Sequence, residues 1–282
     1  MYNKGAALAT LRRWDDALES YDKALEIDPH YAEAWSNKGV ALERLGRYEE
    51  DVECQNKALE INARDEKAWY NKGVALGNLG RTDEALKCCD QALEINPRSA
   101  GAWCNKGVAL AELGRTNEAL KCYDYALEID PRDETAWYNK GTALGKLGRH
   151  EEALKCYDRA LEINPHRAEA WYNKGIALGN LGRTDESLKC CDQALQINPR
   201  YAQAWYNRGV ALRILGRYGE ELKCYDLALL INPRYAAAWS NKGVALYNLK
   251  RHPEARQAFE KAAQLGDAAA RRALEILNRE SH

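Results

Sequence analysis

An asparagine recurs at intervals of 34 residues along the whole chain. The Asn side chain carries two N–H donors and a carbonyl oxygen, which suits paired hydrogen bonds to the N–H and C=O of an extended peptide. The alternative interpretation is that each Asn bonds a helix of the neighbouring repeat and serves only in stacking. Both interpretations apply to the asparagine row, which consists of Asn3, Asn37, Asn71, Asn105, Asn139, Asn173, Asn207 and Asn241.

Tyrosines and charged residues accompany the row at the same period. A tyrosine directly before the Asn adds amphipathic contact area with few side-chain rotors. A variable, often charged residue seven positions after the Asn adjusts the preference for particular peptides. We therefore predict a peptide-binding site formed by the row from Asn37 to Asn241 together with Tyr70, Tyr138, Tyr172, Tyr206, Arg44, Glu112 and Lys146.

The cysteines and histidines offer no comparable chemistry. The period of 34 residues separates equivalent cysteines by about 10 Å in a stack of helices, too far for a disulfide. Adjacent pairs lack zinc-ligand spacing, and Cys104 is expected to be an ordinary exposed thiol. The five histidines share no helical face, so we expect no catalysis, no cofactor and no metal. The periodic cysteines are Cys54, Cys88, Cys122, Cys156, Cys190 and Cys224.

Tryptophans set the framework that positions these side chains. Seven of the eight, from Trp35 to Trp239, follow one another at 34 residues without an insertion, each followed by Gly at the fourth position and Leu at the seventh. Trp, Gly and Leu at this spacing share one face of a helix. The Asn lies two residues after the Trp, about 200° around the helix, and is therefore expected on the open face.

Turn residues divide each copy into two helices. Glycines such as Gly80 and Gly114 are expected to end the first helix as C-caps, and Thr82, Thr116 and Thr184 stand where an N-cap is expected to open the second. Prolines such as Pro97 lie in the connection to the next copy. Each copy is therefore predicted to be a helical hairpin.

The pattern Trp-Tyr-Asn-Lys-Gly-x-x-Leu from Trp69, followed by Gly80, Ala85, Ala92 and Pro97, resembles the tetratricopeptide repeat. The resemblance implies an all-α, right-handed α-solenoid superhelix of about eight repeats with a C-terminal capping helix. We expect a single array over 1–269, with the remainder of the capping helix and the tail at 270–282. The expected repeats are 1–31, 32–65, 66–99, 100–133, 134–167, 168–201, 202–235 and 236–269.

Two features depart from the family pattern. The family usually has Leu three residues after the Trp, whereas this chain has Lys or Arg, from Lys38 to Lys242, so we expect an alkyl stem to cover the core there. The first helix lacks a polar cap and exposes Ala6, Leu8 and Leu11, which predicts self-association through this face.

The resemblance implies a non-catalytic protein-interaction scaffold whose concave groove holds an extended peptide or a partner helix. The row resembles the Asn ladder of O-linked N-acetylglucosamine transferases, so a substrate-recruiting arm of such an enzyme is an alternative, as is a self-assembling structural protein. A carboxylate clamp of the co-chaperone type is disfavoured because Tyr70 and Val74 stand where it needs Lys and Asn.

Charge and hydropathy narrow the partners further. The 282 residues carry 41 basic and 42 acidic side chains, so the chain lacks the basic excess of nucleic-acid-binding proteins, including RNA-binding repeats. No run of about eighteen apolar residues is present. We expect a cytoplasmic protein that binds neither nucleic acid nor membrane.

Overall fold

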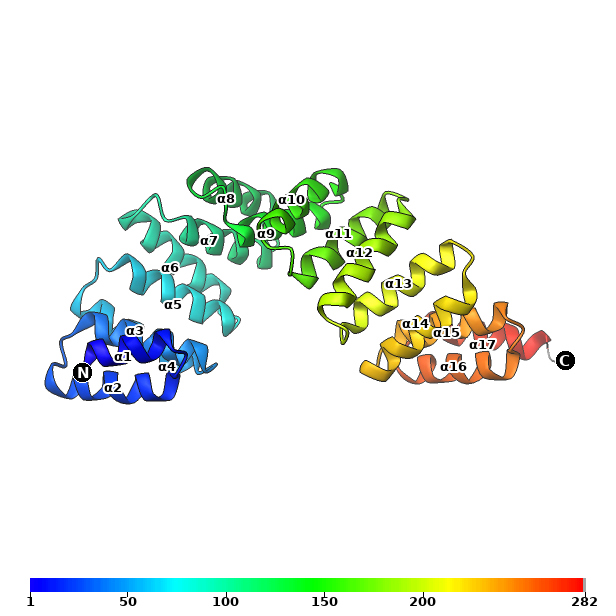
Figure 1. Ribbon diagram of the computed structural model, residues 1–282, viewed down its shortest axis with the longest axis horizontal. Coiled ribbons are helices and arrows are strands. Elements are labelled where there is room, and N and C mark those ends of the chain that lie inside the picture. Colours follow the sequence, from blue (N-terminus) through cyan, green and yellow to red (C-terminus); the bar gives the residue numbers. More distant parts are fainter. Residues whose placement is uncertain (281–282) are drawn as a thin grey trace. The chain divides into compact units, whose positions relative to one another are not determined.

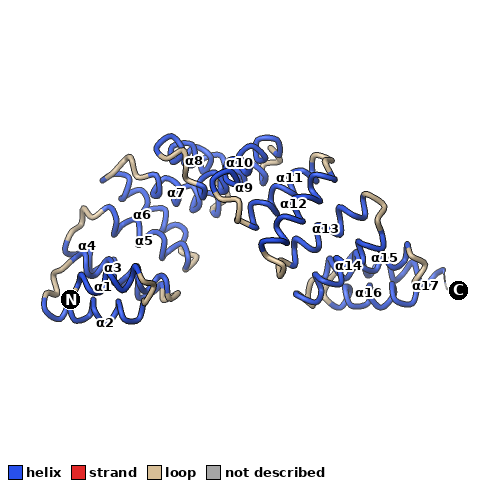
Figure 2. Tube along the Cα trace, in the orientation of Figure 1, coloured by secondary structure: helices blue, strands red, loops and turns tan. Residues whose placement is uncertain are grey.

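The computed structural model describes residues 1–280, with side chains as far as residue 277, and all regular structure in that range is helical. The chain divides into two compact units, Met1–Ala143 and Leu144–His282. Figure 1 labels the helices of each unit, and Figure 2 shows the short loops between them. Residues 281–282 of the predicted tail lie outside the described residues.

The first unit contains four helical hairpins and most of a ninth helix. Within it, each helix from α1 to α7 packs against the next one in the chain. Its helices are α1 (Tyr2–Thr10), α2 (Trp14–Ile27), α3 (Ala32–Arg44), α4 (Tyr48–Ile61), α5 (Glu66–Asn78), α6 (Thr82–Ile95), α7 (Ala100–Glu112), α8 (Thr116–Ile129) and α9 (Glu134–Lys146), which contains the boundary.

The second unit continues the alternation of helices. Each of its helices also packs against the next. They are α10 (His150–Ile163), α11 (Ala168–Asn180), α12 (Thr184–Ile197), α13 (Ala202–Ile214), α14 (Tyr218–Ile231), α15 (Ala236–Asn248), α16 (His252–Gln264) and α17 (Ala268–Glu280).

The first helices of neighbouring repeats also contact one another, as α3 does with α5 and α11 with α13. Each hairpin thus packs only on its neighbours along the chain, which is the arrangement of a solenoid. The prediction of an all-α repeat solenoid is confirmed. That residues 1–269 form a single array stays a prediction.

The core of each hairpin consists of small residues and leucines. The Leu seven residues after each Trp is at most 2% exposed, as at Leu76 and Leu212. The tryptophans are only partly buried, because each indole Nε1 donates to a carbonyl oxygen six residues earlier, in the loop. This bond is 2.9 Å from Trp103 to Pro97 and 3.0 Å from Trp69 to Ala63. The Trp therefore ties the loop to the repeat that it begins.

The C-cap prediction is confirmed, and the N-cap prediction is wrong. Gly80 follows the end of α5 with φ at 71°, and the Arg81 N–H closes the turn on the Leu76 carbonyl at 2.9 Å. Thr82 is already helical, so the N-cap is Arg81, whose side chain accepts no bond. The Arg81 guanidinium instead pairs with Glu84 in the first turn, at 2.7 Å. The same shift occurs at Thr116 and Thr184.

The Lys three residues after the Trp does more than cover the core. Lys106 Nζ lies 2.6 Å from Asp90 Oδ1 on the preceding helix and 5.3 Å from the centre of the Trp103 ring. The stem thus crosses the indole, and the ammonium pairs with the previous repeat. Lys72 has the same ring contact with Trp69.

The two ends of the array differ in how they are covered. Asp267 caps α17 by accepting from the Ala270 N–H at 2.8 Å, which confirms that cap. At the other end Leu8 packs with Trp14, whereas Leu11 is 69% exposed. Self-association through this face stays a prediction. No described helix has the length and apolar character needed to cross a bilayer.

Candidate functional site

The asparagine row lies on the first helix of each repeat. The side chains from Asn37 to Asn241 are all partly buried, whereas Asn3 on α1 is exposed. The row is therefore less open than its angle from the Trp predicts, because the neighbouring repeat covers one side of each amide.

Hydrogen bonds connect the row to the preceding repeat. Asn37 Nδ2 donates to the Tyr2 hydroxyl at 2.8 Å, and Asn241 Nδ2 donates to the Tyr206 hydroxyl at 3.0 Å. Weaker versions join Asn71 to the Ser36 hydroxyl at 3.4 Å and Asn139 to the Cys104 sulfur at 3.9 Å. Stacking, one of the two interpretations of the row, is thus present at these four positions.

One such bond does not exhaust the amide. An Asn has two N–H donors and two acceptor lone pairs, and the contact with the preceding repeat uses one donor. The carbonyl oxygen of Asn241, for instance, lies 3.4 Å from Arg213 Nη1, at the side of the row. Peptide binding by the row is therefore compatible with its role in stacking, and it stays a prediction.

The tyrosines of the predicted site are partly buried as well. The rings of Tyr172 and Tyr201 are 4.8 Å apart, and those of Tyr206 and Tyr235 are 4.9 Å apart, so each tyrosine packs on the start of the next repeat. Burial raises the pKa of Tyr172 and Tyr206. The same is true of Tyr70. These phenols remain protonated hydrogen-bond donors at neutral pH.

Tyr138 occupies the same position on α9 and is also partly buried. The charged residues of the predicted site lie at the ends of first helices and are exposed: Arg44 ends α3, Glu112 ends α7 and Lys146 ends α9. Glu112 Oε2 accepts from the Thr82 hydroxyl at 3.1 Å. Arg44 and Lys146 therefore leave their charge in solvent.

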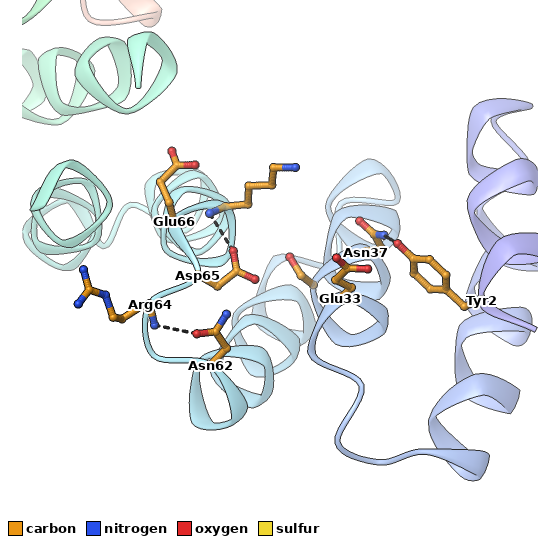
Figure 3. Close-up of a pocket in the computed structure, with 9 residues that line it drawn as sticks. Tyr2, Glu33, Asn37, Asn62, Arg64, Asp65 and Glu66 are labelled. Carbon is orange, nitrogen blue, oxygen red and sulfur yellow. Dashed lines mark hydrogen bonds between the residues drawn. The ribbon is translucent and has the colours of Figure 1, made fainter. Parts of the chain in front are cut away.

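A polar hollow of about 420 Å³ brings several predicted positions together in the first unit. Figure 3 shows Asn37 bonded to Tyr2 on one side and the loop from Asn62 to Glu66 on the other. Glu33 and Lys67 contribute opposite charges to the lining. The loop residues are additions that helix spacing alone did not predict, because the turn places them beside the preceding repeat.

The loop beside this hollow is held by its own side chains. Asp65 Oδ1 accepts from the N–H groups of Lys67 and Ala68, at 3.0 and 3.2 Å, and caps α5. Asn62 Oδ1 accepts from the Arg64 N–H at 3.1 Å. These bonds fix the backbone, so the charged side chains of Arg64 and Lys67 remain available to a ligand.

Two other members of the row line hollows of their own. Asn105 and Glu112 border one between α5, α6 and α7, and Asn207 borders one between α11, α12 and α13. Three asparagines of the row thus lie at recesses of the surface rather than on flat helix faces.

The cysteines are buried and reduced. All nine are free, including Cys104, which is 4% exposed, so the expectation of an exposed thiol there is wrong. The reason is that Asn139 of the next repeat covers it. Burial raises the pKa of Cys54 and of Cys89 to about 12. Among the described residues, no three His, Cys, Asp or Glu side chains gather closely enough to hold a metal ion.

Comparison with known families gives one consistent description. Models of the tetratricopeptide repeat match residues 2–66, 66–99, 100–133, 135–167, 168–201, 190–223 and 236–269. A comparison with curated proteins gave no match.

Solved structures show the same repeat. The Cut9–Hcn1 hetero-tetramer of the APC/C contains a chain that matches with a TM-score of 0.72 and 18% identity, over 94% of this chain and 52% of that one. This chain thus spans about half the length of that relative. MamA matches with a TM-score of 0.54 and 22% identity, over 58% of this chain and 96% of its own. At these identities the likeness concerns the fold.

YrrB is more similar in sequence. It is described as a TPR protein with an unusual peptide-binding site, and it is 29% identical, with a TM-score of 0.57. The match covers 68% of this chain and 98% of YrrB.

Proposed function

Because the chain belongs to the tetratricopeptide repeat family, whose repeats support a protein-interaction scaffold, we propose that it binds extended peptides. In each unit, the asparagine row pairs with the peptide main chain, and the tyrosines beside it contribute contact area. Main-chain recognition gives a weak preference for sequence, which Arg44, Glu112 and Lys146 adjust by their charge.

The observation that carries this proposal is that Asn37, Asn105 and Asn207 each line a hollow on the first helices. An amide whose only role is stacking needs no recess in front of it. The polar hollow at Asn37 also presents both signs of charge, through Glu33 and Lys67, to the two ends of a peptide unit. The peptide-binding site named in the description of YrrB supports the same function.

The test must separate stacking from binding, and the pair Asn241 and Tyr206 does so. Both Asn241→Ala and Tyr206→Phe remove the same hydrogen bond between repeats. Only the first also removes the amide that would hold a peptide. Peptides are first selected from a random library on the full chain, and their Kd and the Tm of each variant are then measured.

We expect the two variants to lose similar Tm, since each loses one hydrogen bond. Asn241→Ala should also lose affinity by about 0.5 to 1.5 kcal/mol, and Tyr206→Phe should keep it. In the first unit, Asn37→Ala, Asn71→Ala and Asn105→Ala combined should weaken binding nearly additively. Asn56→Ala on α4, outside the row, is the control. Unchanged affinity in the triple variant contradicts the proposal.

A further inference from the structure

The glycine four residues after each Trp is covered by a different side chain in different repeats. In four repeats an aromatic ring of the second helix lies directly on it. A Cβ added to the glycine would come within 2.5 to 2.7 Å of that ring. The four pairs are Gly5 with Tyr21, Gly107 with Tyr123, Gly209 with Tyr225 and Gly243 with Phe259.

Repeats three and six lack this ring. Cys89 and Cys191 take its place, and their sulfur atoms would lie 3.5 and 3.6 Å from a Cβ on Gly73 and Gly175. A thiol is several atoms shorter than a phenol, so much of the volume of the ring is not replaced. One turn further along α5, a Cβ on Gly77 would meet no described atom within 4 Å.

The missing volume is open in both repeats. A hollow of about 200 Å³ in repeat three is lined by Gly73, Gly77 and Cys89. The equivalent hollow in repeat six measures about 270 Å³ and is lined by Gly175 and Gly179. An apolar cavity of about 150 Å³ is enough to hold benzene. Each hollow therefore has room for one aromatic ring.

We propose that these two hollows are binding sites for an aromatic side chain, Phe or Tyr, of the bound peptide. The inference rests on the proposed function and adds a side-chain preference to it. The occupant is argued from the chain itself, because Tyr123 and Phe259 show that this place between the helices accepts a phenol or a phenyl ring. The Cys89 sulfur offers a further favourable contact to a ring.

The position of the hollows fits a peptide held by the asparagine row. Asn105 lines the first hollow and Asn207 the second, so a main chain paired with either amide would place a side chain at the opening. The openings differ, because Glu112 borders the first and Ile214 the second. The first should therefore accept Tyr as well as Phe, and the second should prefer Phe.

The test refills the hollows with the residue that other repeats carry. Cys89→Tyr and Cys191→Tyr restore the ring, and the chain already shows the required space in repeat five. There, a Cβ on Gly145, the equivalent of Gly77, would lie 3.7 Å from the Tyr157 hydroxyl. The matched control is Cys88→Ala with Cys190→Ala, which removes the adjacent buried thiols that do not line the hollows.

The first measurement uses p-cresol and toluene, the side chains of Tyr and Phe, as probes. In the NMR spectrum of the full chain, the amide signals of Gly77 and Gly179 should shift saturably in the wild type and in the control. They should not shift in the refilled variant. Absence of a shift in the wild type, or an equal shift in the refilled variant, overturns the inference.

The second measurement uses peptides selected from a random library. We expect an aromatic residue in them, and a Kd about tenfold or more higher for the refilled variant. Replacing that aromatic residue by Ala should cost the same factor on the wild type and nothing further on the refilled variant.

The outcomes separate this inference from the function on which it rests. Peptides that bind the refilled and wild-type proteins equally overturn the aromatic sites and leave peptide binding in place. Probe binding that the refilling abolishes, with no peptide retained at all, supports the ring sites and contradicts the proposed function. If the Tyr variants do not fold, Gly77→Leu with Gly179→Leu fills the hollows from the opposite wall and is expected to give the same results.

Discussion

Repeats two and four, both in the first unit, fill the same place between their helices with opposite chemistry. In repeat four the Tyr123 ring lies on Gly107. In repeat two the place over Gly39 holds Gln55 and Asp51, which are 0% and 1% exposed. The hairpin therefore tolerates an aromatic or a polar filling, provided that the glycine leaves room for it.

The polar filling of repeat two is hydrogen-bonded internally. Gln55 Nε2 donates to Asp51 Oδ1 at 2.8 Å and to the Ser36 carbonyl at 3.1 Å. Burial, with a smaller contribution from the charge of Glu43, raises the pKa of Asp51 to about 6. The comparison teaches that one repeat is stabilised by packing, whereas the other contains an ionisable group whose burial costs free energy at neutral pH.

The largest expected effect comes from emptying repeat four. Tyr123→Ala removes a ring that is 2% exposed. We expect the free energy of unfolding to fall by about 3 to 5 kcal/mol, as for other large-to-small aromatic changes in cores. Urea denaturation followed by circular dichroism measures it. A loss below about 1 kcal/mol would show that the ring is not essential to the packing of this hairpin.

Acid should stabilise repeat two. Because the pKa of Asp51 is about 6 in the folded chain and 3.8 as its ordinary value, the folded state binds the proton more tightly. The resulting stability is complete below pH 3.8 and is lost as the pH rises through 6. The change amounts to about 3 kcal/mol over this window.

The matched variant for this pH dependence is Asp51→Asn, which keeps the shape of the side chain and cannot ionise. Its stability relative to the wild type, measured by urea denaturation at several pH values, should be highest at pH 7 and should shrink toward pH 4. A difference that does not vary with pH contradicts the raised pKa.

Exchanging the two fillings should have an intermediate effect. Asp51→Ala with Gln55→Tyr gives repeat two the pair that repeat four has in Ala119 and Tyr123. We expect a gain of about 1 to 3 kcal/mol at pH 7, since a buried charge is replaced by a packed ring. Gln55→Tyr alone should destabilise, because it leaves Asp51 without its hydrogen-bond donor. Equal stability of the single and double variants would contradict this account.

The smallest effect concerns the ion pairs on the second helices. Asp124 of repeat four lies 2.5 Å from Lys140, whereas repeat two has Asn56 at the equivalent position, next to Lys72. Asn56→Asp should complete the pair and add at most about 0.5 kcal/mol. The gain in Tm should disappear at high salt, and a gain that persists there would exclude an ion pair as its cause.

The hairpins could be predicted from the sequence because their signals are local. The period of Trp35 to Trp239 fixes the repeat, and glycines such as Gly80 adopt the positive φ that ends a helix. The N-caps could not be predicted from residue type, since Thr82 suits a cap but the turn that ends at Arg81 leaves it one position too late. Cap identity depends on where the preceding turn closes, which composition does not record.

The candidate site was only partly predictable, because it depends on contacts between repeats. The sequence places Asn37 away from the Trp face, but not within hydrogen-bonding distance of Tyr2. It also shows that Cys89 replaces a Tyr without showing whether the helices close over the lost volume. The hollow persists because neighbouring repeats fix the separation of α5, α6 and α7.

The buried thiols have a consequence for observing the chain in motion. Alkylating reagents attack thiolates, and burial raises the pKa of Cys122 and Cys190 to about 11. A folded repeat should therefore react only when it opens locally. Since the thiols recur every 34 residues, pulse labelling followed by peptide mass mapping would record the opening rate of one repeat after another, with no probe introduced into the sequence.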